Sequence, residues 1–107
     1  MNKEPRQVHI GVEAGEIKYS AGLLHANPGD TIRWSSKQGP FAIEFAGISP
    51  VSFGGRRSQS GDRGHQLVGV VRKLAQPGVY RYACALSVND EIYLDAGCPE
   101  IIIDIDL

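Results

Sequence analysis

The sequence predicts a single all-β domain, a Greek-key β-sandwich, and three observations support this fold class. The 107 residues include 13 glycines and 6 prolines, which is typical of a chain with many tight turns. Short stretches in which apolar and polar residues alternate recur along the chain, as in strands with one buried face. The stretch from Gln76 to Ala85 combines a Pro-Gly turn with a strand in which Tyr80, Tyr82 and Cys84 share one face. A chain of this length forms one domain around one core.

The composition excludes several classes of protein. The 11 basic and 12 acidic residues give a formal net charge of −1, so no strong field favours nucleic acid or an anionic membrane. No run of about 18 apolar residues predicts a membrane-spanning helix, and the first residues lack the apolar run of a signal peptide. If Met1 is the native start, we expect a cytoplasmic protein. A chain from which an export signal had been removed would instead be periplasmic or secreted.

The first strands are predicted from alternation and from one turn. A polar tail over residues 1–6 precedes a strand over 8–12, in which apolar side chains alternate with polar ones. A weaker alternation predicts a short edge strand over 16–20. Residues 23–26 then lead into the sequence Asn-Pro-Gly-Asp at 27–30, a strong turn signal because proline presets one backbone angle and glycine accepts positive φ. We expect this turn to form a hairpin with the next strand.

The middle of the chain combines strands of clear alternation with one long irregular segment. The strand after the turn places Ile32 and Trp34 on one face, so the only tryptophan is expected in the core. A loop then leads to a strand over 41–45 with a clear apolar face. From Gly47 to Gly64 the alternation gives way to serine, glycine and arginine, which predicts a long loop. Loops of this length are usually functional or mobile.

The last third contains the tyrosine strand and a closing strand. Residues 67–74 are rich in β-forming residues and end at the Gln-Pro-Gly turn over 76–78. The closing strand is predicted from alternating isoleucines over 101–105. We expect residues 86–98 to form the loop that joins these last two strands.

Two motifs in this order resemble the cupredoxin family, the β-sandwich fold of blue copper proteins. The first is Asn-Pro-Gly-Asp-Thr-Ile-Arg-Trp at residues 27–34, and the second is Pro-Gly-Val-Tyr-Arg-Tyr-Ala-Cys at residues 77–84. The resemblance covers the chain from about Leu24 to its end. It implies a Greek-key β-sandwich of cupredoxin type.

The resemblance also implies where copper ligands would lie, and most of them are missing. A blue copper centre needs two imidazoles, one thiolate and a weak axial thioether. The first histidine position matches Phe41, which cannot ligate copper, and no histidine follows Cys84. The axial position falls at Gly97 or Cys98, while Met1 is the only methionine. We therefore expect no metal and no cofactor, and a binding or interaction module rather than an enzyme.

Alternative roles for Cys84 stay open at this stage. A buried free cysteine would act as a small core hydrophobe. The resemblance places Cys84 and Cys98 at the same pole of the sandwich, where a disulfide would close a loop of 13 intervening residues and stabilise the fold by roughly 3 kcal/mol. An atypical copper site for electron transfer would combine Cys84 with His65 or Cys98. The other histidines, His9 and His25, are expected on outward faces of strands.

Polar segments supply the remaining candidates for contacts. The long loop carries Arg56, Arg57 and Arg63, which would bind a partner's carboxylates unless the loop is simply flexible and polar. The acidic residues between 89 and 95 lack the spacing of a calcium-binding loop, so we expect a solvated acidic loop there: Asn89, Asp90, Glu91 and Asp95.

The function is expected at the loops of the copper-site pole and over residues 47–64, because loops vary while the sandwich holds its strands rigidly. No serine lies in a recognisable motif with a histidine, which favours no enzymatic activity. The expected partner is a protein or a small ligand, with no nucleic acid and no membrane. We also expect one aromatic-rich core in which Phe41 fills the copper pole, formed with Trp34, Tyr80, Tyr82 and Ile103.

Overall fold

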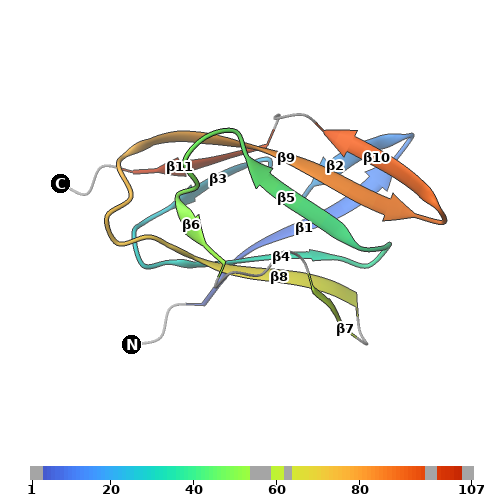
Figure 1. The fold of residues 1–107 in the computed structure, drawn as a ribbon, viewed down its shortest axis with the longest axis horizontal. Helices are drawn as coiled ribbons and strands as arrows, with labels where there is room; N and C mark the ends of the chain where they lie inside the picture. Colours follow the sequence, from blue (N-terminus) through green and yellow to red (C-terminus); the bar gives the residue numbers. More distant parts are fainter. Residues whose placement is uncertain (1–3, 54–58, 62–63, 96–98, 105–107) are drawn as a thin grey trace.

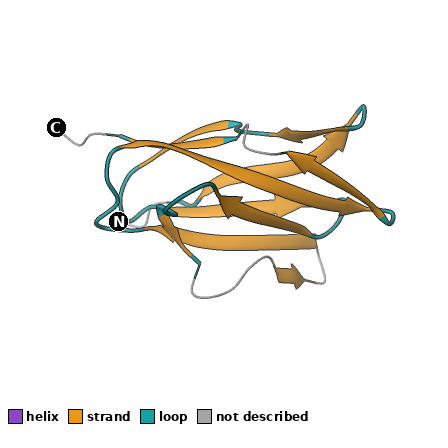
Figure 2. Cartoon of the chain, turned by 45° about the horizontal axis from the view of Figure 1, so that its top comes forward, coloured by secondary structure: helices purple, strands orange, loops and turns teal. Residues whose placement is uncertain are grey.

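The computed structural model describes residues 4–53, 59–61, 64–95 and 99–104. Strands and connecting turns account for these residues, and none of them lies in a helix that could cross a membrane (Figures 1 and 2). The strands are β1 (Arg6–Glu13), β2 (Glu16–Tyr19), β3 (Leu23–Ala26), β4 (Thr31–Ser36), β5 (Phe41–Phe45), β6 (Val51–Ser52), β7 (Gln59–Gly61), β8 (Gly64–Val71), β9 (Gly78–Val88), β10 (Glu91–Asp95) and β11 (Glu100–Ile103).

The strands form two sheets stacked face to face (Figure 1). The first sheet has the order β2-β1-β4-β8-β6, and β7 also pairs with β8. The second has the order β10-β9-β11-β3, and β5 also pairs with β9. Each sheet is mixed, because β1 runs parallel to β4 and β3 runs parallel to β11 while the other pairs are antiparallel. The all-β fold class predicted from the sequence is confirmed, with two mixed sheets that stack as a sandwich.

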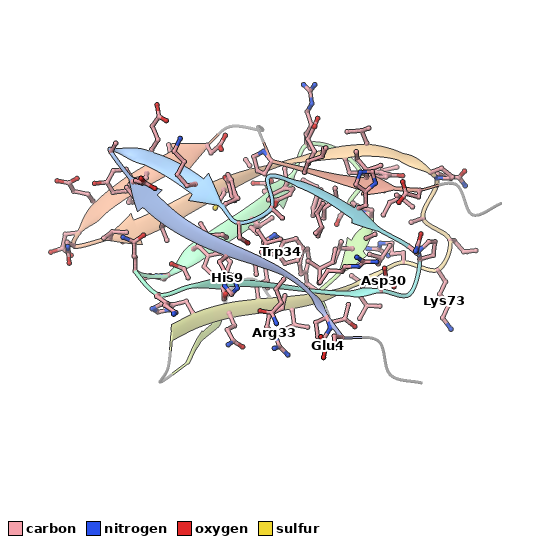
Figure 3. The ribbon with its side chains drawn as sticks, turned by 180° about the vertical axis from the view of Figure 1, so that it is seen from behind. Glu4, His9, Asp30, Arg33, Trp34 and Lys73 are labelled. Atoms are coloured by element: carbon pink, nitrogen blue, oxygen red, sulfur yellow. The ribbon has the colours of Figure 1, made fainter. Side chains whose placement is uncertain are left out.

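The core lies between the sheets around Trp34 and Tyr82, whose side chains are fully buried. The Trp34 indole N–H donates to the Tyr82 hydroxyl at 3.3 Å. Two further rings pack beside this pair, with centroid distances of 5.3 Å from Phe45 to Tyr82 and 5.6 Å from Phe53 to Trp34. Figure 3 shows Trp34 between the sheets and Arg33 on the opposite face of β4. The alternation along β4 thus directs its tryptophan inward, as predicted.

The expected core group is confirmed. Phe41, Trp34, Tyr82 and Ile103 are buried in one cluster, and Tyr80 packs against it while partly buried. These residues come from four strands in both sheets. Their common burial is the hydrophobic contribution that holds the sheets together.

The turn over residues 27–30 does not form the expected hairpin, so that prediction is wrong. It joins β3 of the second sheet to β4 of the first, and the chain crosses between the sheets here. The turn is held to β8 by main-chain bonds from Gly29 N to Val71 O at 2.9 Å and from Val71 N to Asp30 O at 2.8 Å. The buried Asp30 carboxylate accepts the Asn27 backbone N–H at 2.9 Å and lies 3.6 Å from Arg6 Nε. Local turn chemistry therefore predicted the turn but not the sheets that it connects.

The segment from Gly47 to Gly64, expected to be a long loop, contains the short strands β6 and β7 within its described part. Val51 of β6 is buried and pairs with Val71 of β8. The backbone of Gly69 lies under this strand, because a Cβ atom there would be 2.3 Å from Val51 Cγ1. A single buried valine thus fixes a strand that is too short for alternation to reveal.

The tyrosine strand is longer than predicted. β9 continues beyond Cys84 to Val88, because Leu86 and Val88 keep the inward alternation. A two-residue turn with φ of 50° at Asn89 and 67° at Asp90 then leads into β10, and such angles are typical of a tight hairpin. The prediction of a loop over residues 86–98 is therefore wrong at its start, because residues 86–88 belong to β9 and residues 91–95 form β10.

Candidate functional site

Cys84 lies in the middle of β9, where its backbone pairs with Ile43 of β5 on one side and Asp95 of β10 on the other. Its side chain is buried in the core. Burial raises the pKa of the thiol to about 11, with a hydrogen bond to Tyr19 lowering it and the Asp95 charge raising it. Because the thiolate is the nucleophile and the metal ligand, Cys84 is a protonated, weakly reactive thiol at neutral pH.

Tyr19 and Asp95 form a polar contact beside this thiol. The Tyr19 hydroxyl donates to Asp95 Oδ2 at 3.0 Å. Burial raises the pKa of Tyr19 well above its usual value, and the nearby Cys84 and Asp95 raise it further. Since β2 belongs to the first sheet and β10 to the second, this contact joins the two sheets at one edge. A groove of about 450 Å³ lies there, with Leu94 and Pro99 also in its wall.

Phe41 fills the position where the cupredoxin resemblance implies a histidine. It begins β5, pairs with Leu86 of β9 and is only 3% exposed. The loop before it approaches β9 closely, since Ser87 N donates to Pro40 O at 2.9 Å. A Cβ atom on Gly39 would lie 1.8 Å from Ser87 O, so only glycine fits there. This end of the sandwich is closed by an aromatic ring and by tight backbone contact.

The structure places the three histidines on the first sheet and on β3. His9 and His25 are exposed, as predicted, with His9 Nδ1 2.8 Å from Ser35 Oγ and His25 Nδ1 3.0 Å from an Asp104 carboxylate oxygen. His65 was predicted at the end of the long loop, from which it could approach Cys84 only if that loop folded back; it lies within β8 of the first sheet, opposite Ser36. His65 Nδ1 is buried and has no hydrogen-bond partner among the residues that the structure describes.

Cys98 lies outside the described residues, so its disulfide with Cys84 stays a prediction. Among the described residues, Cys84 has no disulfide partner. The described residues that flank Cys98 are placed beside β9: Asp95 pairs with Cys84, and Pro99 O accepts the Tyr82 backbone N–H at 3.1 Å. The partner contacts predicted in the long loop also lie outside the described residues, at Arg56, Arg57 and Arg63.

The described residues do not fit a blue copper centre. Cys84 offers a single soft donor atom, held protonated in the core beside Ile43 and Tyr19. The ring of Phe41 offers no donor atom at all. Within the described ranges, no three or more His, Cys, Asp or Glu side chains gather where they could hold a metal ion. A blue copper centre needs three close ligands and a weak axial one.

The acidic residues expected in one loop are divided between two places. Asn89 and Asp90 make the turn between β9 and β10, and Glu91 follows it at the start of β10. Asp95 lies at the other end of β10, where it accepts the Tyr19 hydroxyl. The expectation of a single solvated acidic loop is therefore wrong, because residues 91–95 form a strand.

Sequence reasoning missed an apolar groove on the outer face of the second sheet. We call it the outer groove; it has a volume of about 270 Å³ and is lined by Pro40, Phe41, Ala42, Ala85, Leu86, Ser87 and Ile92. Next to it on β10 lies Leu94, which is 76% exposed, while Ile92 is 70% exposed. The alternation of Ile92 and Leu94 with polar residues is a strand signal that could have revealed this surface.

Comparisons with known proteins give a limited result. No protein-family model matches the sequence, and no curated protein matches it. Solved structures do match, and one of them is the oxidized form of a point mutant of amicyanin. That alignment covers 94% of this chain and 82% of the amicyanin chain, with 12% sequence identity and a TM-score of 0.49. A likeness at this level carries no argument about function, and the fold class rests on the strand order and pairing described above.

Proposed function

We propose that this chain is a cupredoxin-like binding or interaction module without a blue copper centre. The burial of Phe41 carries the proposal. A histidine at the start of β5 would need its ring nitrogens near the metal, whereas Phe41 contributes a ring to the core cluster and is 3% exposed. A side chain buried in this way stabilises the fold through its apolar area. Residue 41 therefore stabilises the core by packing and does not bind a metal.

The state of Cys84 supports the same proposal. Its thiol is buried, its pKa is raised to about 11, and β9 continues past it as a regular strand paired on both sides. These features are typical of a core cysteine rather than a ligand at a loop. With no activated nucleophile at Cys84, the proposal includes no enzymatic step.

Electron transfer through an atypical copper site is the second candidate, and one observation favours it. His65 Nδ1 is buried without a partner among the described residues, and a buried nitrogen of this kind requires an explanation. A site with Cys84 would need His65 or Cys98 as a further ligand.

Titration with copper(II) separates the two candidates. We expect the purified protein to develop no intense absorption from thiolate-to-copper charge transfer. An intense blue or green band that disappears in Cys84→Ser and weakens in His65→Gln would instead establish the copper site. A band that persists in Cys84→Ser would come from a thiolate at Cys98, the other cysteine of the sequence, and would also contradict the proposal.

A further inference from the structure

The outer groove has large apolar walls and a floor of small residues. Ile92 and Leu94 stand on β10 and pair with Ser87 and Ala85 of β9, which therefore lie on the same face. Ala42 of β5 pairs with Ala85 from the other side. Across the face the side chains thus run from large on β10 to small on β9 and β5. A groove of about 270 Å³ results, and it is apolar and open to solvent.

This surface is unusual for an exposed strand. Single apolar residues are common on protein surfaces, but adjacent ones that flank a groove indicate an interaction site. Strands near the edge of a sheet normally carry charges that discourage contact. β10 instead exposes Ile92 and Leu94 at 70% and 76%. On the first sheet, by contrast, the groove beside His9 includes the polar side chains of Lys18 and Gln38.

Carboxylates border the outer groove. Glu44 is exposed on β5 beside Ala83, and Asp90 is exposed in the turn that leads into β10. Arg81, the cation on this face of β9, is bound to Glu100 at 3.0 Å. Because the whole chain has a formal net charge of only −1, this acidic border is a local feature. Charges around an apolar contact select the partner and speed the encounter.

We propose that the outer groove docks a partner protein through an apolar side chain flanked by lysine or arginine residues. This inference rests on the proposed function as a binding module and names its surface. At about 270 Å³ the groove lies at the lower end of the roughly 300–1,000 Å³ typical of sites for drug-sized ligands, a size that suits one protruding side chain. A second copy of this chain would oppose carboxylates to carboxylates, and an anionic membrane would be repelled, because like charges across an interface are unfavourable.

Two synthetic peptides of equal length provide the test. Both carry Leu-Phe-Leu at the centre, one flanked on each side by two lysines and the other by two glutamates. We expect the lysine peptide to shift the backbone amide resonances of Ala42, Ala85 and Ile92 in nuclear magnetic resonance spectra. Its affinity should fall when the salt concentration rises from about 20 mM to about 200 mM, since salt screens exposed charges. The glutamate peptide should leave these resonances unchanged.

Variants sharpen the result. Ile92→Ser removes one wall and should weaken binding of the lysine peptide by about tenfold or more, the equivalent of one exposed aliphatic side chain. Val68→Ser is the matched control, because Val68 is 43% exposed on the outer face of the other sheet; it should bind like the wild type. Glu44→Lys replaces a carboxylate on the face of the groove by a positive charge and should also weaken binding of the lysine peptide, whereas Val68→Ser should not.

Several outcomes would overturn the inference. These are the absence of shifts, equal shifts with both peptides, or shifts centred on β4 and β8. A dimer in sedimentation that dissociates in Ile92→Ser would identify a second copy as the occupant. Binding to vesicles that contain phosphatidylserine, lost in the same variant, would identify a membrane. All of these would leave the proposed function standing, whereas a copper band that requires Cys84 would overturn that function whatever the peptides do.

Discussion

Tyr82→Phe is expected to destabilise the protein by about 1–3 kcal/mol at neutral pH, the usual effect of leaving a buried donor unsatisfied. The Tyr82 hydroxyl is buried and accepts the Trp34 indole N–H at 3.3 Å. Its ring would stay, so the edge contact with Trp34 at 6.0 Å and the contact with Phe45 at 5.3 Å would be kept. The hydrogen bond is slightly longer than usual, which favours the lower end of the range.

The difference between the two proteins is expected to shrink as the pH rises. Burial raises the pKa of Tyr82 to about 12 from its usual value of 10.0. Above pH 10 the unfolded chain therefore loses this proton while the folded chain keeps it. The stabilisation is fully present below pH 10 and is lost towards pH 12, at up to about 1.4 kcal/mol per pH unit. The total loss is about 3 kcal/mol in the wild type and is absent from the variant, so the two stabilities should converge near the top of this window.

Urea denaturation followed by Trp34 fluorescence measures both effects, at pH values from about 7 to about 12 in steps of about one unit. Tyr80→Phe is the control, because the Tyr80 hydroxyl donates to Gln76 O at 2.6 Å at an exposed position; its stability should stay close to that of the wild type. Equal stabilities of Tyr82→Phe and the wild type at pH 7 would refute the role of the buried hydrogen bond. A difference that does not change with pH would refute the argument from burial.

The remaining predictions concern packing, thiol reactivity and one turn. Gly69→Ala should destabilise the fold by about 1–3 kcal/mol in thermal unfolding, because its methyl group would lie 2.3 Å from a β6 valine; Gly22→Ala, with nothing within 4 Å, should have little effect. In a Cys98→Ser background, Cys84 should react with a disulfide reagent at pH 8 far more slowly than in urea, since with a pKa of about 11 only about one molecule in a thousand carries the thiolate; equal rates would contradict its burial. Asp90→Gly should raise the melting temperature slightly, because φ is 67° there and glycine adopts this angle without strain; a lower melting temperature would argue against this explanation.

Alternation predicted the parts of the fold in which one strand buries one face. It placed Trp34 and Phe41 in the core and gave His9 an outward position, all as the structure has them. It also gave the tyrosine strand its inward face. These successes share a cause, because the period of two along a strand is set by the backbone itself and needs no knowledge of neighbours.

The wrong predictions concern which strands pair with each other and which face of a strand is buried. The turn at residues 27–30 has the chemistry of a hairpin, yet Asp30 is bonded to Val71 of β8 and the chain changes sheet. Residues 91–95 were predicted to be an acidic loop. In the strand that they form, the apolar Ile92 and Leu94 are the exposed residues, whereas strands usually bury their apolar face.

The candidate site shows the same division. The inward positions of Cys84 and Phe41 were recognisable from the alternation in their strands. The contact of Tyr19 with Asp95 was not, since these residues lie on different sheets and meet only when the sandwich closes. A contact between residues so far apart in sequence leaves no periodic signal.

The parallel pairing of β3 with β11 has a consequence for the way the chain folds. Leu23 lies beside Glu100, so most of the chain must be gathered before this ladder can form. Closing so large a loop lowers the entropy of the chain before any contact of the ladder stabilises it. Folding is therefore expected in the slow, millisecond-to-second regime of β-sandwiches. Until β11 docks between β9 and β3, both strands keep a row of unpaired backbone groups. In that interval a crowded, partly folded population is exposed to pairing with other copies of itself, so refolding yield should depend on protein concentration.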